Sequence, residues 1–173
     1  QSASIATDGS DEIDWFHNNS LWYDEKNDLV LLSARHKDAI IAIHKSDKSL
    51  AWILGDPANW NGVDKKYFFT PTGDDFEWQY AQHQITMLDN GDIMMFDNGT
   101  AKVKLSDNDN RVSGDDIYSR AVVYHINTDD MTIEQVFEYG KERGPEWYSD
   151  WISGVISLDG TKDQLWITAG ANL

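Results

Sequence analysis

The sequence predicts an all-β fold, more specifically a partial β-propeller, and three observations lead to that prediction. Short apolar and aromatic runs alternate with polar turns, as they do in antiparallel sheets. Aromatic residues make up 12% of the chain, with 8 tryptophans, and such residues favour strands. No long amphipathic run indicates a helix. At 173 residues the chain is long enough for one domain with a real core.

Residues 15–55 are predicted to form a first propeller blade. The links at 24–28 and 45–48 are rich in residues that favour turns. Four antiparallel strands in about forty residues is the size of one blade. The strands are expected at His17–Tyr23, Leu29–Arg35, Ala39–His44 and Ser49–Leu54.

Residues 56–78 are predicted to be a long irregular loop, because prolines, glycines and aromatic residues interrupt any strand pattern. Loops of this length usually carry function or are partly disordered. Its aromatic side chains are therefore candidates for contacts with a ligand. They include Trp60, Tyr67, Phe68 and Phe69.

A second blade is predicted over residues 79–140 and a partial third blade over residues 150–173. The sequence Asp89-Asn90-Gly91 is a strong hairpin signal, because Asn-Gly suits a type I′ turn. A polar insertion, Lys104–Tyr118, separates the two halves of the second blade. The expected strands are Gln82–Leu88, Asp92–Phe96, Ala121–Ile126 and Ile133–Tyr139, followed by Ser153–Ser157 and Gln164–Thr168 in the third blade.

The sequence pattern of the opening hairpin recurs in each of the three blades, beginning at Ser20, Thr86 and Val155. About two and a half blades cannot close a propeller, which typically has four to eight. We therefore expect a fragment of a larger propeller, completed by the rest of the same protein or by another copy of the chain.

Composition excludes several classes of partner. A formal charge of −16 argues against nucleic acid and anionic membranes, which need clustered Lys and Arg. No apolar stretch approaches the roughly 18 residues of a membrane span. The absence of Cys excludes disulfides, thiolate metal sites and thiol nucleophiles in this chain. A small anion can still bind where a few basic groups converge.

Neither a metal site nor a cofactor is predicted. The acidic run Asp107–Asp116 lacks the glycine and closing glutamate that an EF-hand loop places at fixed positions, so it is interpreted as a solvated loop. The sequons at Asn18 and Asn98 matter only in a eukaryotic secretory pathway.

Two histidines and one arginine are the candidates for chemistry. His17 and His83 each open the innermost strand of a blade, and Arg35 ends the strand that follows His17. In a meander His17 and Arg35 reach the same edge of the sheet. A lone histidine near aromatic residues is more often structural. Two at matching repeat positions, with an arginine close by, predict an anion pocket with a nucleophile or general base.

The other basic residues are assigned structural roles. Strand alternation predicts that His36 points to the face opposite Arg35. His44 and His125 lie at the ends of third strands and are expected to lie away from the propeller axis. Arg120 is a weaker site candidate, and a salt-bridged framework role is expected for it.

Three segments resemble the bacterial arylsulfate sulfotransferase family, and the similarity runs over nearly the whole chain. They begin Asp14-Trp-Phe-His-Asn-Asn-Ser, Leu31-Leu-Ser-Ala-Arg-His-Lys and Gln79-Tyr-Ala-Gln-His-Gln. The resemblance implies a six-bladed propeller, usually periplasmic, with its active site at the central channel. It also implies ping-pong transfer of a sulfuryl group from an aryl sulfate to a phenolic acceptor, without a nucleotide sulfate donor or other cofactor.

Four residues receive roles through this resemblance. His83 falls on the family's nucleophile, which forms a transient sulfohistidine. His17 and Arg35 fall on its sulfuryl-binding pair, and Asn19 lies beside them as a substrate-binding residue. A further active-site histidine of the family lies outside these 173 residues. The rival hypothesis is a propeller that binds a sulfated or aromatic ligand without turnover.

Overall fold

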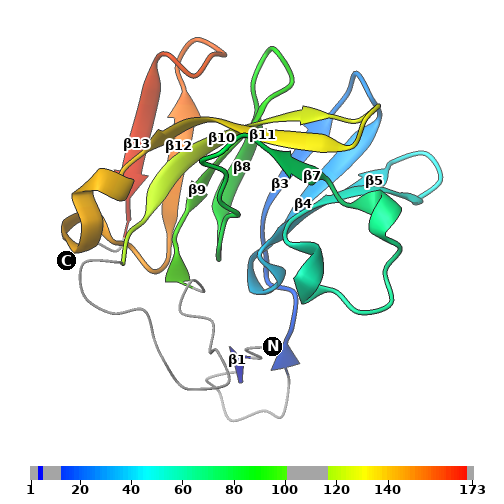
Figure 1. The fold of residues 1–173 in the computed structure, drawn as a ribbon, viewed down its shortest axis with the longest axis horizontal. Coiled ribbons are helices and arrows are strands. Elements are labelled where there is room, and N and C mark those ends of the chain that lie inside the picture. Colours follow the sequence, from blue (N-terminus) through cyan, green and yellow to red (C-terminus); the bar gives the residue numbers. More distant parts are fainter. Residues whose placement is uncertain (1–3, 6–12, 101–116, 171–173) are drawn as a thin grey trace.

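The described part of the chain is built mainly from β-strands, nearly all of them paired antiparallel. A computed structural model describes residues 4–5, 13–100 and 117–170 (Figure 1). Within them lie a four-stranded sheet, a five-stranded sheet and two two-stranded sheets, joined by turns and short 3₁₀ helices. The predicted all-β class is confirmed.

The first large sheet has the strand order β3-β4-β5-β6, with every neighbouring pair antiparallel. Apolar side chains of the two inner strands, β4 and β5, are largely buried, because residues of the second sheet pack against them. Each strand lies within one residue of its predicted bounds. The strands are β3 (Asn18–Asp24), β4 (Leu29–Ala34), β5 (Ala39–His44) and β6 (Leu50–Leu54).

The second large sheet has the order β7-β11-β10-β9-β8. All five residues of β9, an inner strand of this sheet, are buried. Four strands agree with the prediction, and the short β7 is an addition. The strands are β7 (Thr70–Thr72), β8 (His83–Met87), β9 (Ile93–Asp97), β10 (Arg120–Asn127) and β11 (Thr132–Tyr139).

The segment 56–78 is more regular than predicted. It contains two 3₁₀ helices, η2 (Pro57–Asn59) and η3 (Lys65–Tyr67), before β7. Strand β7 pairs in parallel with the outer strand β11. Its proline sits on an edge strand, where a missing N–H donor is tolerated.

Two aromatic residues of this segment are core residues. The ring of Phe69 meets Trp52 edge-on at 5.5 Å between centroids, and Phe68 packs with Ala39 and Ile53. Phe68 and Phe69 are 6% and 2% exposed. The prediction that they contact a ligand is therefore wrong, because their surface is already used to attach the segment to the first sheet.

Two small sheets complete the described part. The strands β12 (Ser153–Ser157) and β13 (Leu165–Ala169) form a hairpin after the 3₁₀ segment η6 (Lys141–Trp147). The two-residue strands β1 (Ser4–Ile5) and β2 (Ile13–Asp14) pair near the start of the chain. Most of the predicted insertion Lys104–Tyr118, including the acidic run Asp107–Asp116, lies outside the described residues.

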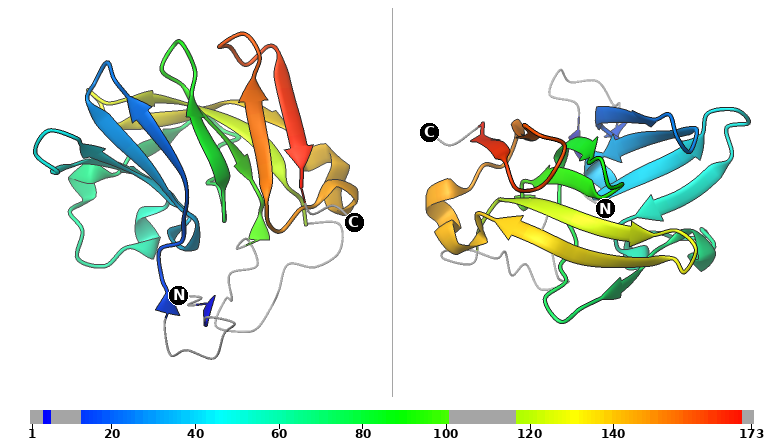
Figure 2. Two further views of the ribbon diagram at one scale, coloured as in Figure 1. Left: turned by 180° about the vertical axis from the view of Figure 1, so that it is seen from behind. Right: turned by 90° about the horizontal axis from the view of Figure 1, so that it is seen from above.

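The opening strands of the three successive units lie side by side. Strand β8 contacts both β3 and β12. The three hairpin turns that follow these strands gather at one end of the molecule, and the strand starts gather at the other (Figure 2). The residues just before β3, β8 and β12 are thereby brought together.

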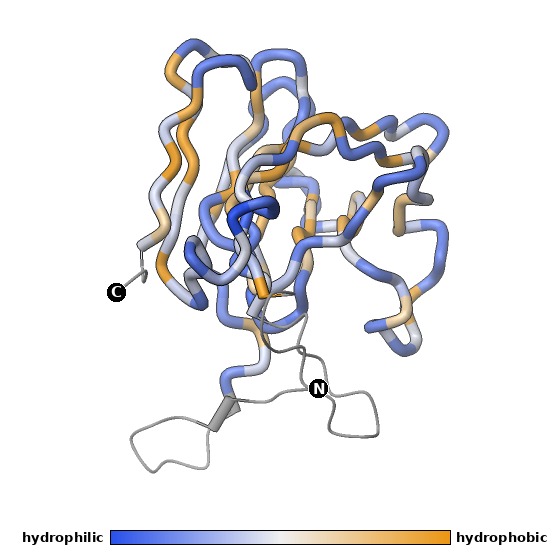
Figure 3. Tube along the Cα trace, turned by 60° about the vertical axis from the view of Figure 1, so that its left-hand side comes forward, coloured by the Kyte–Doolittle hydropathy of each residue, from blue (hydrophilic) through white to orange (hydrophobic). Residues whose placement is uncertain are grey.

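Apolar residues fill the space between the sheets. One cluster joins the first and second sheets and includes Leu31, Trp52, Phe69, Met95 and Tyr124. Another joins the second sheet to the β12–β13 hairpin. Hydrophobic stretches follow the strands, whereas the turns are mostly hydrophilic (Figure 3). No helix in the described part is long and apolar enough to cross a bilayer.

Candidate functional site

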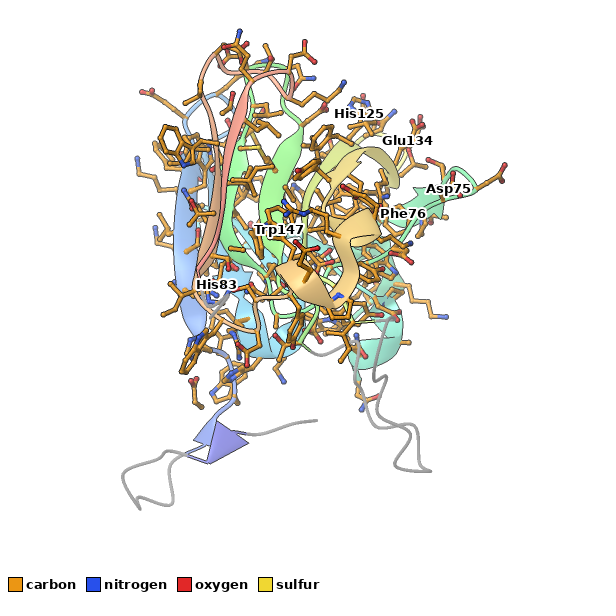
Figure 4. All side chains as sticks on the ribbon, turned by 90° about the vertical axis from the view of Figure 1, so that its left-hand side faces the viewer. Asp75, Phe76, His83, His125, Glu134 and Trp147 are labelled. Carbon is orange, nitrogen blue, oxygen red and sulfur yellow. The ribbon has the colours of Figure 1, made fainter. Side chains whose placement is uncertain are left out.

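His83 begins β8 and is half-buried at the end of the molecule where the strands start (Figure 4). Two nearby residues, Ala81 and Gln84, have positive φ angles of 53° and 50° although neither is glycine. The register between β8 and β9 shifts between His83 and Thr86. Bulges and unusual backbone angles are frequent at functional sites, where they aim a side chain.

The ring of His83 is held by a buried amide. His83 Nδ1 lies 2.6 Å from Oδ1 of Asn98, the residue that follows β9. Asn98 Nδ2 donates to the Ser149 carbonyl at 2.7 Å. Because that contact fixes which end of the amide faces His83, Oδ1 accepts and Nδ1 carries the proton. The Nε2 atom of His83 then keeps its lone pair.

His83 is set up to be neutral. Burial lowers the pKa of His83, hydrogen bonds to Asn98 and to the Ala81 backbone oppose that shift, and the electrostatic effects of Arg35 and His17 lower the pKa further. A neutral imidazole is the form that can act as a nucleophile.

Arg35 connects the first sheet to the segment before β12. It lies in η1 (Arg35–Lys37), a 3₁₀ turn between β4 and β5. Its backbone N–H donates to the His17 carbonyl at 3.1 Å. Its guanidinium Nη2 donates to the Asp150 carbonyl at 3.2 Å. The structure thus brings Arg35 beside His17, as the meander predicted.

His17 lies immediately before β3 and has a positive φ of 49°. Asp14 holds it at two points, accepting from the backbone N–H at 3.0 Å and lying 2.5 Å from Nδ1. The hydrogen bond from His17 lowers the pKa of the Asp14 carboxyl. His17 and His83 therefore occupy similar places but face different partners, a carboxylate and an amide.

His36 does not follow the prediction of an opposite-facing side chain. Its Nδ1 lies 2.6 Å from the Asp14 carbonyl, and its ring centroid is 4.7 Å from that of His17. Strand alternation fails here because residues 35–37 form a 3₁₀ turn. His36 therefore packs against the candidate site.

Asp14, His17 and His36 together raise the question of a metal. Their ligand atoms lie within 4.8 Å of one another. Zinc holds such ligands at about 2.0–2.2 Å, so ligand atoms around one ion lie roughly 3.5 Å apart. Both Nδ1 atoms already bond to Asp14. The arrangement fits a hydrogen-bonded positioning network better than a preformed metal centre.

Asn19 lies between the first and second sheets. Its Nδ2 donates to the Gln82 carbonyl at 2.8 Å, directly before His83. Its Oδ1 is buried and makes no hydrogen bond. Ser20, its neighbour, accepts a hydrogen bond from the Ile85 N–H at 3.0 Å. A substrate-binding role for Asn19 stays a prediction.

Arg120 is a framework residue, as expected. Its side chain is fully buried, and Nε donates to Asp97 Oδ2 at 2.9 Å. His125 also has a structural contact, with Nδ1 2.7 Å from Asp92 Oδ1. It lies toward the end opposite His83 (Figure 4).

Sequence reasoning missed Asn98, which it treated only as a sequon. A signal was available in the Asp89–Gly91 turn, because this turn folds β9 back along β8. The residue just past the end of β9 must then lie near the start of β8. Asp14 was missed as well, although it precedes His17 by three residues.

Comparison with known proteins identifies the family. The family model for arylsulfotransferase (ASST) matches residues 1–173. The chain belongs to the arylsulfotransferase family. The resemblance inferred from the sequence motifs is thereby confirmed.

Two relatives within this family are both called arylsulfate sulfotransferase AssT. The protein from Lelliottia amnigena is 31% identical over 176 residues, covering 92% of this chain. The protein from Escherichia coli O6:H1 (strain CFT073) is 30% identical over 173 residues, covering 91% of this chain. In each case the chain spans 28% of the relative's length.

Proposed function

We propose that this chain supplies the nucleophile and part of the sulfuryl-binding site of an aryl-sulfate sulfotransferase. The observation that supports this most strongly is a half-buried His83 with Nδ1 bonded to Asn98 and Nε2 left as the nucleophilic atom. Its family membership and the names of its two bacterial relatives point to the same chemistry. The substrates are an aryl sulfate donor and a phenolic acceptor.

The first half-reaction transfers the sulfuryl group to the enzyme. His83 Nε2 attacks sulfur, an N–S bond forms, and the bond from sulfur to the aryl oxygen breaks. The aryl oxide leaves with the electron pair. Arg35 and His17, which both act electrostatically on His83, would hold the sulfuryl oxygens through their N–H donors as charge shifts in the transition state.

The second half-reaction discharges the enzyme. A phenolic oxygen attacks the same sulfur, the N–S bond breaks, and His83 regains its neutral form with the electron pair on Nε2. The phenolic proton passes to water or to a base. No nucleotide donor or resident cofactor takes part in this scheme, which is ping-pong because the two substrates react in turn.

The proposed architecture is a β-propeller. The three successive sheets would be consecutive blades, two complete and one partial, with β3, β8 and β12 lining the axis. Their side-by-side packing and the shared end of their strand starts support this arrangement (Figure 2). The remaining blades would come from the rest of the same protein or from another copy. The periplasmic location stays a prediction.

The test uses a chromogenic aryl sulfate and the full-length protein. With donor alone, mass spectrometry at neutral or alkaline pH should find a sulfuryl adduct on the peptide containing His83. Phenol should then discharge it. His83→Asn should remove adduct and turnover together, by about a thousandfold or more, as for loss of other nucleophiles.

His17→Asn is the matched control, because His17 occupies the equivalent position in the first sheet. It should slow both half-reactions while the adduct still forms on His83. An adduct on His17, or near-normal turnover in His83→Asn, would overturn the assignment. Saturable binding of the aryl sulfate without release of the chromophore would instead favour a ligand-binding propeller.

A further inference from the structure

We propose that Asn98 is the positioning residue for His83: it fixes the Nδ1–H tautomer and thereby presents Nε2 as the reacting atom. The chemical consequence rests on the proposed function of His83. The tautomer is a property of the fold and can be measured without any turnover.

Asn98 is held in one orientation by its surroundings. It is fully buried. Its Nδ2 donates to the Ser149 carbonyl at 2.7 Å and lies 3.4 Å from Ser153 Oγ. The backbone carbonyl of Asn98 accepts a hydrogen bond from Ser119 Oγ at 2.8 Å. Flipping the amide would set Oδ1 against the Ser149 carbonyl, two acceptors facing each other, so the flipped state is disfavoured.

The same contacts join Asn98 to the segment before β12. Ser119 Oγ also accepts from the Ser149 N–H at 2.8 Å, and Ser149 Oγ lies 2.9 Å from Ser153 Oγ. The orientation of the His83 ring on β8 therefore depends on a hydrogen-bonded group that lies just after β9, just before β10, and before and at the start of β12. This group is distinct from Arg35 and His17, which act on His83 through charge.

The choice of an amide matters because the equivalent histidine has a carboxylate. The carboxylate of Asp14 lies 2.5 Å from His17 Nδ1. Asn98 offers an acceptor of similar geometry to His83 but no negative charge. The charged groups that act on the His83 ring are Arg35, from the turn after β4, and His17, from the start of β3. Both favour neutral His83, so the structure assigns the nucleophile to the histidine with the amide partner.

The first experiment measures the tautomer by ¹⁵N NMR of histidine-labelled full-length protein. Wild type should show a protonated, pyrrole-type Nδ1 and an unprotonated, pyridine-type Nε2 for His83, identified by the signals lost in His83→Asn. Asn98→Ala should shift the ring toward the Nε2–H form. Asp14→Asn is the control and should leave the His83 signals in place. An Nε2–H tautomer in wild type would overturn the proposal.

The second experiment measures the rate of sulfuryl loading against pH. Asn98→Ala should slow loading by about tenfold to hundredfold, as when an orienting partner is lost. Asn98→Asp places a carboxylate beside His83, so the acid limb of its loading profile should move up by about one pH unit or more, with recovery at alkaline pH. A purely structural role would lower the rate at every pH alike.

The outcomes of these two experiments distinguish the role of Asn98 from the proposed function of His83. Wild-type rates and an unmoved pH profile in both Asn98 variants would refute the role of Asn98 while leaving His83 as nucleophile. An adduct that maps away from His83 would refute the proposed function, and the NMR experiment would still decide whether Asn98 fixes the tautomer. If Asn98→Asp does not fold, as judged by circular dichroism, the two measurements on Asn98→Ala decide the question.

Discussion

Arg120→Met should destabilise the protein by about 3 kcal/mol or more, because it removes the cation from a buried ionic network. The Arg120 side chain is fully buried. Its Nε donates to Asp97 at 2.9 Å, and its Nη1 donates to Glu138 at 2.5 Å and to Gln135 at 3.0 Å. Its Nη2 donates to the Glu77 carbonyl at 3.0 Å.

The magnitude follows from what remains after Arg120 is removed. Breaking a buried pair by deleting one partner costs about 3–5 kcal/mol. Asp97, 1% exposed, loses its cation but keeps N–H donors from Tyr80 and Gly99, each at 2.9 Å. Glu138 is 25% exposed and can recover some hydration. These two compensations place the expected loss nearer 3 than 5 kcal/mol.

The assay is urea unfolding of wild type and variant, compared by linear extrapolation. Arg143→Met is the matched control. Arg143 is exposed, lies 3.8 Å from the Glu146 carboxylate and stacks over the Trp147 ring. It should cost about 1 kcal/mol or less. Equal losses in the two variants, or a loss below about 1 kcal/mol for Arg120→Met, would refute the reasoning.

Three further results are expected. Arg35→Lys should lower kcat/KM by roughly tenfold to hundredfold, because lysine keeps the charge but loses the two-pronged donor, and unchanged kinetics would show that Arg35 does not touch the sulfuryl group. Sulfuryl loading should fall as the pH drops through the pKa of His83, which lies below its ordinary value of 6.5. The free energy of unfolding should also fall as the pH drops from 6.5 to that lower pKa, because His83 takes up its proton in the unfolded chain before it does so in the folded protein. A rate independent of pH between 5 and 8 would argue for a limb at still lower pH, and a limb above 6.5 would contradict the shift. Phe69→Ala should cost about 3–5 kcal/mol in stability with KM unchanged, and a raised KM in folded protein would restore Phe69 as a ligand contact.

The strands were predictable because they depend on local signals. Alternating apolar residues and turn-forming links set the bounds of β3 to β6 within one residue. Asn90-Gly91 correctly predicted the β8–β9 hairpin, although only Gly91 has a positive φ and the turn is therefore not type I′. The same meander logic brought Arg35 to His17.

The remaining features depend on contacts between distant segments. Strand β7 forms because it pairs in parallel with β11, and nothing in Thr70–Thr72 itself favours a strand around a proline. His36 turns toward His17 because Arg35–Lys37 tightens into a 3₁₀ turn. Asn98 is oriented by the Ser149 carbonyl, 51 residues further along the chain. Local pattern does not reveal any of these contacts.

The separation of hairpin turns and strand starts also offers a place for a spectroscopic probe. The second and third turns touch, since the Asp89 N–H donates to the Gly160 carbonyl at 3.0 Å. The first turn is closed by its own contact from the Asn27 N–H to Asp24 Oδ1 at 3.2 Å, and Lys26 within it is exposed. Because these 173 residues contain no cysteine, Lys26→Cys gives the chain a single thiol for a fluorophore. A dye placed there would report on the environment of the first hairpin turn, at the end of the molecule opposite His17 and His83 (Figure 2).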